Sequence, residues 1–256
     1  MKKAKYKIMG IIIPLLIIIA WYLATTDMGI PSTILPAIDS VFDTGVEMAK
    51  SGQLISDLGI SIGRVVKGFL VSGVIGVLLG SLMGMSKTVE SLFYPIITTI
   101  RQIPMIAWIP LIILWAGIGE SSKVIIIVIA AVFPILVNTM SGIAGTPKGY
   151  VEVAKLYRLN QVAVFTKVYL PHALPQILVG LKLGLGVSWM AVVASELIAA
   201  ASGIGYRMNE ARSLMQSDKV IVCMIVIGLI GILMDKFISV IFSKITPWIK
   251  INAREE

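Results

Sequence analysis

The chain has little of what catalytic and metal sites are made of. Its 256 residues include one cysteine, Cys223, and one histidine, His172. A single cysteine excludes a disulfide within one chain, and a single histidine excludes paired-histidine haem ligation and clustered zinc ligands. No Ser/His/Asp set or paired carboxylates suggest hydrolysis. The chain is therefore predicted not to be an enzyme, and to bind no metal or cofactor of its own.

A phosphate-binding loop is also missing. The nearest candidate is Gly84-Met85-Ser86-Lys87-Thr88, which lacks the Gly-x-x-x-x-Gly-Lys-Ser/Thr spacing and ends an apolar run instead of following a strand. If this protein works with ATP, we expect the nucleotide and its magnesium ion on another chain.

Charged residues are scarce, and long apolar runs take their place. Charged side chains make up 14% of the chain and hydrophobic ones 57%, and the mean hydropathy of +0.93 is far above that of a soluble domain. A helix needs about 20 apolar residues to cross roughly 30 Å of hydrocarbon. The sequence predicts an all-α integral membrane protein with six transmembrane helices, at about 8–25, 62–85, 96–117, 122–143, 174–198 and 219–242.

We expect one transmembrane domain over residues 1–256. Residues 1–61 would be an N-terminal anchor helix and outer segment, residues 62–245 the transmembrane core, and residues 246–256 a tail. The first apolar segment lacks a convincing small-residue cleavage site, so we expect a retained anchor and not a signal peptide.

The distribution of Lys and Arg predicts the orientation. With the N-terminus inside, the inner connections hold roughly twice as many Lys and Arg residues as the outer ones, and Arg101 is counted among the inner ones. Both termini and residues 146–171 are therefore predicted to be cytoplasmic. The net charge of +8 follows from this topology and from attraction to anionic lipid, so no nucleic-acid partner is expected.

A polar segment with a helical pattern separates the fourth and fifth apolar segments. Thr146 suits a helix cap, Pro147 suits a first turn, and Asn160 suits a turn because Asn tolerates left-handed backbone. Two short helices joined by a turn would form a protrusion with two faces. The apolar face holds Val153, Leu156 and Tyr157, and the charged face holds Glu152, Lys155 and Arg158.

Glu152-Val153-Ala154, followed at fixed spacing by Val168-x-Leu170-Pro171, resembles the cytoplasmic coupling-loop signature of bacterial ABC importer permeases. The family pattern is Glu-Ala-Ala, three residues, Gly, nine residues, Ile-x-Leu-Pro. Here Val153 replaces the first Ala, Val168 the Ile, and Arg158 the Gly. Because Arg is a poor replacement for Gly in a turn, Asn160 is the candidate to supply the turn geometry.

The resemblance implies that this loop docks on cytoplasmic ABC ATPase subunits. It also implies an external substrate-binding protein, a location in the bacterial inner membrane, and a homodimer, since one chain supplies one loop for a two-fold motor. An amphipathic loop that meets no partner is the alternative. The coupling residues would be Glu152, Val153, Ala154, Leu156, Tyr157, Arg158, Leu170 and Pro171.

Prolines interrupt two of the apolar segments. Pro104 and Pro110 are expected to break or kink the third segment, and Pro134 the fourth. Broken backbone in a membrane is tolerated where protein or a water-filled cavity covers it, which suggests a translocation route between segments three, four and five. Small residues that let helices approach closely lie in segments two and five: Gly76, Gly80 and Gly84, and Gly180 and Gly184.

Further motifs over about residues 55–245 resemble the permease branch for small anions such as sulfonates, taurine and nitrate. They include Arg101-x-Ile103-Pro104, Ser188-Trp189 and Ala194-x-Glu196. Because fixed positive charges in the membrane segments are few, neutral hydrogen-bond donors are expected to line the path of the anion. Glu196 would instead help to close the outer gate of this path, or form an ion pair with Arg207 or Arg212. The predicted pathway residues are Pro104, Trp108, Pro110, Ser188, Trp189 and Glu196.

The function predicted is thus the permease subunit of an ATP-driven importer of a small anion. A secondary transporter or channel remains an alternative, which predicts intramembrane acids or an inverted repeat. A membrane assembly subunit or intramembrane enzyme is another. Lys182, an intramembrane charge, is expected to extend toward the cytoplasmic surface.

Overall fold

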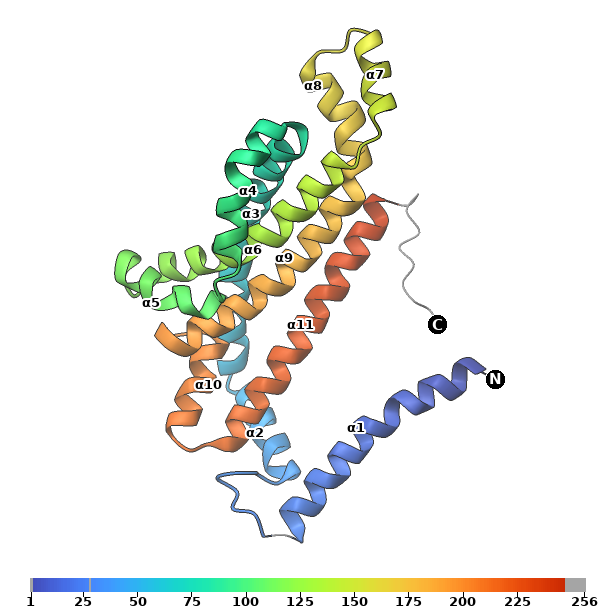
Figure 1. The fold of residues 1–256 in the computed structure, drawn as a ribbon. Coiled ribbons are helices and arrows are strands. Elements are labelled where there is room, and N and C mark those ends of the chain that lie inside the picture. Colours follow the sequence, from blue (N-terminus) through green and yellow to red (C-terminus); the bar gives the residue numbers. More distant parts are fainter. Residues whose placement is uncertain (1, 28, 247–256) are drawn as a thin grey trace.

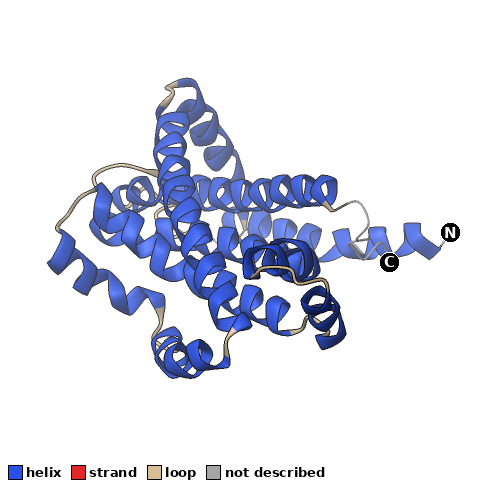
Figure 2. Cartoon of the chain, turned by 90° about the horizontal axis from the view of Figure 1, so that it is seen from above, coloured by secondary structure: helices blue, strands red, loops and turns tan. Residues whose placement is uncertain are grey.

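The computed structural model describes residues 2–27 and 29–246, and these form helices joined by short connections with no strand among them (Figures 1 and 2). In chain order the helices are α1 (Lys2–Thr26), α2 (Ile38–Lys50), α3 (Gln53–Met85), α4 (Lys87–Arg101), α5 (Met105–Ala116), α6 (Glu120–Ala144), α7 (Lys148–Leu156), α8 (Gln161–Val164), the π-helical turn η1 (Phe165–Tyr169), α9 (Leu170–Ala199), α10 (Ile204–Ser213) and α11 (Ser217–Ile245).

The core of the bundle is α6, which packs against α3 on one side and α9 on the other. Glycines bring the backbones together at both contacts. A Cβ atom at Gly80 of α3 would lie 2.6 Å from the carbonyl oxygen of Leu136, and one at Gly180 of α9 would lie 2.8 Å from Cβ of Asn138. The close approach expected from the glycine spacing is confirmed, and α6 is the shared partner.

Four helical segments are long and apolar enough to cross a membrane: α3, α6, the continuous stretch Gln161–Ala199, and α11. The pair α4 and α5 adds a fifth if it counts as one span, but the two helices are bent by 99°. In α1 the apolar stretch Gly10–Thr26 is shorter, so the sixth predicted span remains a prediction.

The third span is broken at one of the expected places. The helix stops at Arg101 and resumes at Met105, so the break lies directly before and at Pro104. Pro110 lies inside α5 and Pro134 inside α6, and both helices continue through them. The break expected at Pro134 is therefore wrong, because α3 and α9 hold α6 on both sides of that position.

The helix that contains the second predicted span begins before that span. Helix α3 starts at Gln53, so the expected boundary between residues 61 and 62 lies inside it. Asp57 lies in the part of α3 before the predicted span and Arg64 lies near the start of that span, and both are charged. In the fold these side chains are buried and bonded to other helices, so they do not end the apolar helix.

The N-terminal helix lies apart from the bundle (Figure 1). The indole nitrogen of Trp21 donates to the carbonyl oxygen of Pro36 over 2.9 Å, which holds the end of α1 near the start of α2. Helix α2, the expected helix of the outer segment, packs against α11 and α3. The predicted tail, apart from Thr246, lies outside the described residues.

Candidate functional site

Helices α7 and α8 project from one end of the bundle, opposite α2 and α10 (Figure 1). Helix α7 is preceded by Pro147, which has extended backbone and provides no side-chain cap. Thr146 does not cap α7, so that expectation is wrong. Its side chain is buried at the end of α6, where its hydroxyl has no hydrogen-bond partner within the described part of the chain.

The turn between α7 and α8 has an unexpected residue at its centre. Arg158 has a φ of 53°, in the left-handed region. The amide of Leu159 donates to the carbonyl of Ala154, and the amide of Arg158 to that of Lys155. These two bonds are the pattern of the Schellman motif, whose left-handed position favours Gly.

The turn geometry is therefore kept with Arg at the position where the coupling-loop signature has Gly. The expectation that Asn160 replaces it is wrong. Asn160 has a φ of −71° and begins α8, and its side-chain oxygen accepts from the amide of Ala163 over 2.8 Å. Asn160 is the cap of the second helix and not the turn residue.

The surface of the protrusion exposes large apolar side chains next to charged ones. The exposed fractions of Val153, Leu156 and Tyr157 are 51%, 82% and 79%. Glu152 and Arg158 are also exposed, whereas Ala154 is buried under the turn. Pro171 is exposed and Leu170 half-buried, at the first residues of α9. Exposed large apolar side chains on a polar protrusion are a mark of a protein-binding surface.

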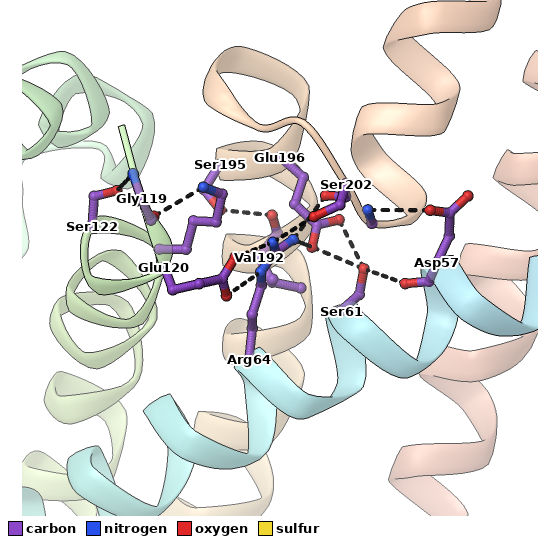
Figure 3. A network of polar contacts seen from close by, with 12 residues as sticks. Asp57, Ser61, Arg64, Gly119, Glu120, Ser122, Val192, Ser195, Glu196 and Ser202 are labelled. Carbon is purple, nitrogen blue, oxygen red and sulfur yellow. Dashed lines mark hydrogen bonds and ion pairs between the residues drawn. The ribbon is translucent and has the colours of Figure 1, made fainter. Parts of the chain in front are cut away.

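At the other end of the bundle, a buried group of polar side chains centres on Arg64 (Figure 3). Arg64 of α3 donates to Glu196 of α9 over 2.7 Å and, through Nε, to Glu120 of α6 over 2.8 Å. It also donates to the carbonyl oxygen of Ser202 over 2.8 Å. One guanidinium thus joins the three central helices to the segment that precedes α10.

The same group holds the start of α10. The carboxylate of Glu196 accepts from the amide of Gly205 over 2.9 Å, and the hydroxyl of Ser61 accepts from that of Ile204 over 3.0 Å. Asp57 of α3 accepts from Nε of Arg207 over 2.8 Å. Burial would lower the pKa of Arg207, but the hydrogen bond and charge of Asp57 together with Glu210 raise it.

The expected partner of Glu196 is therefore wrong. Glu196 pairs with Arg64, whereas Arg207 pairs with Asp57 and Glu210, and Arg212 donates to Asn209. The sequence contained one signal for Arg64, because an Arg next to a long apolar run is costly unless it is paired. Its partner could not be identified, since it is 132 positions away.

The other predicted pathway residues do not form one group. Pro104 and Trp108 line a cleft of about 410 Å³ between the α4–α5 break, α6 and α9. Pro110 is exposed further along α5. The hydroxyl of Ser188 is buried and donates to Gly184, and the indole of Trp189 donates to the carbonyl of Ile227 in α11. Both of these donors already have partners within the chain.

Lys182 also has a partner. Its ammonium group lies 3.2 Å from a carboxylate oxygen of Asp235 in α11, and the two side chains are about half exposed. Sequence reasoning treated Lys182 alone and missed this pair.

Long spans, one broken span beside a cleft, and an exposed protrusion at one end are features of a membrane transport component. Residues 72–250 match the family described as binding-protein-dependent transport system inner membrane component. The chain belongs to this family, as the coupling-loop resemblance indicated.

Relatives whose names include a substrate support the resemblance to the permease branch for small anions. A Bacillus subtilis permease named for aliphatic sulfonates transport is 36% identical over 93% of this chain and 87% of its own length. An Escherichia coli taurine transport system permease is 31% identical over 89% of this chain and 85% of its own. A nitrate import permease of Synechocystis is 34% identical over 73% of this chain and 68% of its own.

A solved structure supports the fold. One chain of an amino acid ABC transporter superposes with a TM-score of 0.63 at 18% identity, covering 78% of this chain and 97% of that one. The helical arrangement described above is thus that of an ABC transporter permease.

Proposed function

We propose that this chain is the permease subunit of an ATP-driven ABC importer for small anions, of the sulfonate, taurine and nitrate branch. The observation that carries the proposal is the α7–α8 protrusion, which exposes Val153, Leu156 and Tyr157. The ATPase subunit would cover this apolar surface. Glu152 beside it would accept hydrogen bonds from donor groups of the ATPase subunit.

The connections of the protrusion explain how docking could move the membrane part. Helix α6 ends at Ala144 and leads directly into α7, while α8 and η1 continue into α9. The two helices that enter and leave the protrusion are packed against each other along the bundle. A displacement of the protrusion by the ATPase would therefore displace α6 and α9, which form two walls of the cleft that contains Trp108.

The remaining partners follow from the same proposal. Two copies of this chain would provide two protrusions for two ATPase subunits, which would bind ATP and magnesium. A substrate-binding protein would dock at the opposite end, near α2 and α10. That end would face outward, and both termini would be cytoplasmic in the inner membrane.

The experiment is transport by the complex of this chain with its ATPase and its substrate-binding protein in proteoliposomes, with Glu152→Arg as the variant. A hydrogen bond to a charged group contributes about 1.5–3 kcal/mol, so ATPase docking should weaken roughly tenfold or more. Lys244→Glu is the matched control, since Lys244 is an exposed charge at the end of α11, outside the protrusion. Wild-type uptake by Glu152→Arg would contradict the proposal.

A further inference from the structure

The α4–α5 break places a positive charge beside a cleft of the bundle. Helix α4 starts at Lys87 beside the end of α3, is 15 residues long and ends at Arg101. At 1.5 Å per residue, about 22 Å of helix lies between Arg101 and that starting end, against roughly 30 Å for a whole hydrocarbon layer. From the sequence Arg101 is counted among the inner connections, and in the structure it is the last residue of α4, directly before the break.

Arg101 lines the cleft at this break. The cleft has a volume of about 410 Å³, and its wall includes Trp108 of α5 and Phe133 and Asn138 of α6. Most of the other lining side chains are apolar. The cleft is thus an apolar hollow with one guanidinium and one amide at its edge.

The environment of Arg101 differs from that of two other basic residues in the spanning helices. Arg64 is bonded to Glu120 and Glu196, and Lys182 to Asp235. Within residues 2–27 and 29–246, by contrast, no ion pair or side-chain hydrogen bond involves Arg101, and the residue is exposed. A charge in a membrane segment is costly unless it is neutralised, and such residues mark ligand pathways.

The chemistry of the cleft selects a class of ligand. A guanidinium presents a planar fork of donors that matches two oxygens of an oxyanion. Asn138 uses one N–H to bond the carbonyl of Pro134 over 2.8 Å, and an amide has a second N–H to offer. The aromatic rings of Trp108 and Phe133 would cover carbon and not charge.

We infer that this cleft binds the transported anion during passage, with Arg101 contacting a sulfonate or carboxylate head and Trp108 and Phe133 contacting its carbon chain. The inference rests on the proposed function for the identity of the ligand. It replaces the expectation that neutral donors alone pass the anion. An anionic phospholipid head carries the same chemistry, so the experiment must separate the two sources.

The test measures binding without transport. The permease–ATPase complex, without a binding protein, is placed in phosphatidylcholine nanodiscs and titrated with ethanesulfonate, butanesulfonate and hexanesulfonate. Affinity should rise with chain length, because each further buried CH₂ adds up to about 0.8 kcal/mol. Arg101→Gln should weaken binding of all three roughly tenfold or more, and Arg101→Lys should weaken it less. Trp108→Ala should instead flatten the dependence on chain length.

The matched control is Lys87→Gln, which removes one positive charge from the opposite end of α4. Unchanged binding by Arg101→Gln, or no sulfonate binding by the wild type, overturns the inference. So does loss of co-purified phosphatidylglycerol from Arg101→Gln with sulfonate binding intact, since the site would then belong to lipid. If Arg101→Gln loses sulfonate binding but the wild type shows no ATP-dependent uptake, the site stands and the proposed function fails.

Discussion

Arg64 and Glu196 form an ion pair of 2.7 Å whose side chains are 3% and 0% exposed. The pair joins α3 to α9 at the end of the bundle opposite the protrusion. Because Glu196 also accepts from the start of α10, a change at either residue affects three helices. This connection ties α3, α9 and the start of α10 together at that end of the bundle.

Arg64→Met should destabilise the protein markedly. Removing one member of a buried ion pair leaves the other charge uncompensated, which costs about 3–5 kcal/mol. The measurement is the thermal midpoint of the detergent-solubilised complex. Lys67→Met, at an exposed position one turn along α3, is the control and should change the midpoint little. The double variant Arg64→Met with Glu196→Gln should recover part of the loss, and no recovery would argue against a charge effect.

Gly80→Ala should separate α3 from α6. The added Cβ would lie 2.6 Å from the carbonyl oxygen of Leu136, and a backbone atom cannot move aside as a side-chain end can. We expect a loss of about 1–3 kcal/mol in the free energy of unfolding. Gly63→Ala on the same helix has no atom within 4 Å of its Cβ and should be neutral or stabilising. Equal behaviour of the two variants would show that α3 and α6 do not pack this closely.

Arg158→Gly should stabilise the turn between α7 and α8. A left-handed backbone costs a non-glycine residue about 1–2 kcal/mol, although Gly also loses more chain entropy on folding, so the net gain should be near 1 kcal/mol. Hydrogen exchange of the Leu159 amide should slow accordingly. Asn160→Ala, which removes the cap of α8, should speed exchange nearby. Faster exchange in Arg158→Gly would mean that Arg158 stabilises the turn through its side chain.

Single cysteines should report the orientation. In a Cys223→Ser background, Asp43→Cys and Arg212→Cys should react with an impermeant thiol reagent in intact cells, because both positions are exposed at the end predicted to face outward. Lys155→Cys on the protrusion should react only after permeabilisation. Strong labelling of Lys155→Cys in intact cells would reverse the topology and remove the basis for cytoplasmic ATPase docking.

Several local features followed from the sequence because they depend on neighbouring residues. The apolar runs predicted α3, α6, α9 and α11, since whether a helix can enter a bilayer depends on its own composition. The spacing from Glu152 to Pro171 predicted the protrusion and the family. The Gly80 and Gly180 spacings predicted close helix contacts, because Gly alone removes the side chain from that surface.

Other features depended on residues distant in the chain. The sequence showed that Glu196 was an unusual charge, yet its partner Arg64 is 132 positions away and became identifiable only through folding. The same holds for Lys182 and Asp235. Whether a helix continues through a proline also depended on the helices packed against it. Helix α6 continues through Pro134 between α3 and α9. The chain breaks before Pro104, where Arg101 lines a cleft. The thickness and apolar interior of a bilayer constrain the length and composition of each segment separately, so the sequence reveals them. The partner of a buried charge depends on which helices pack together, so only the tertiary structure reveals it.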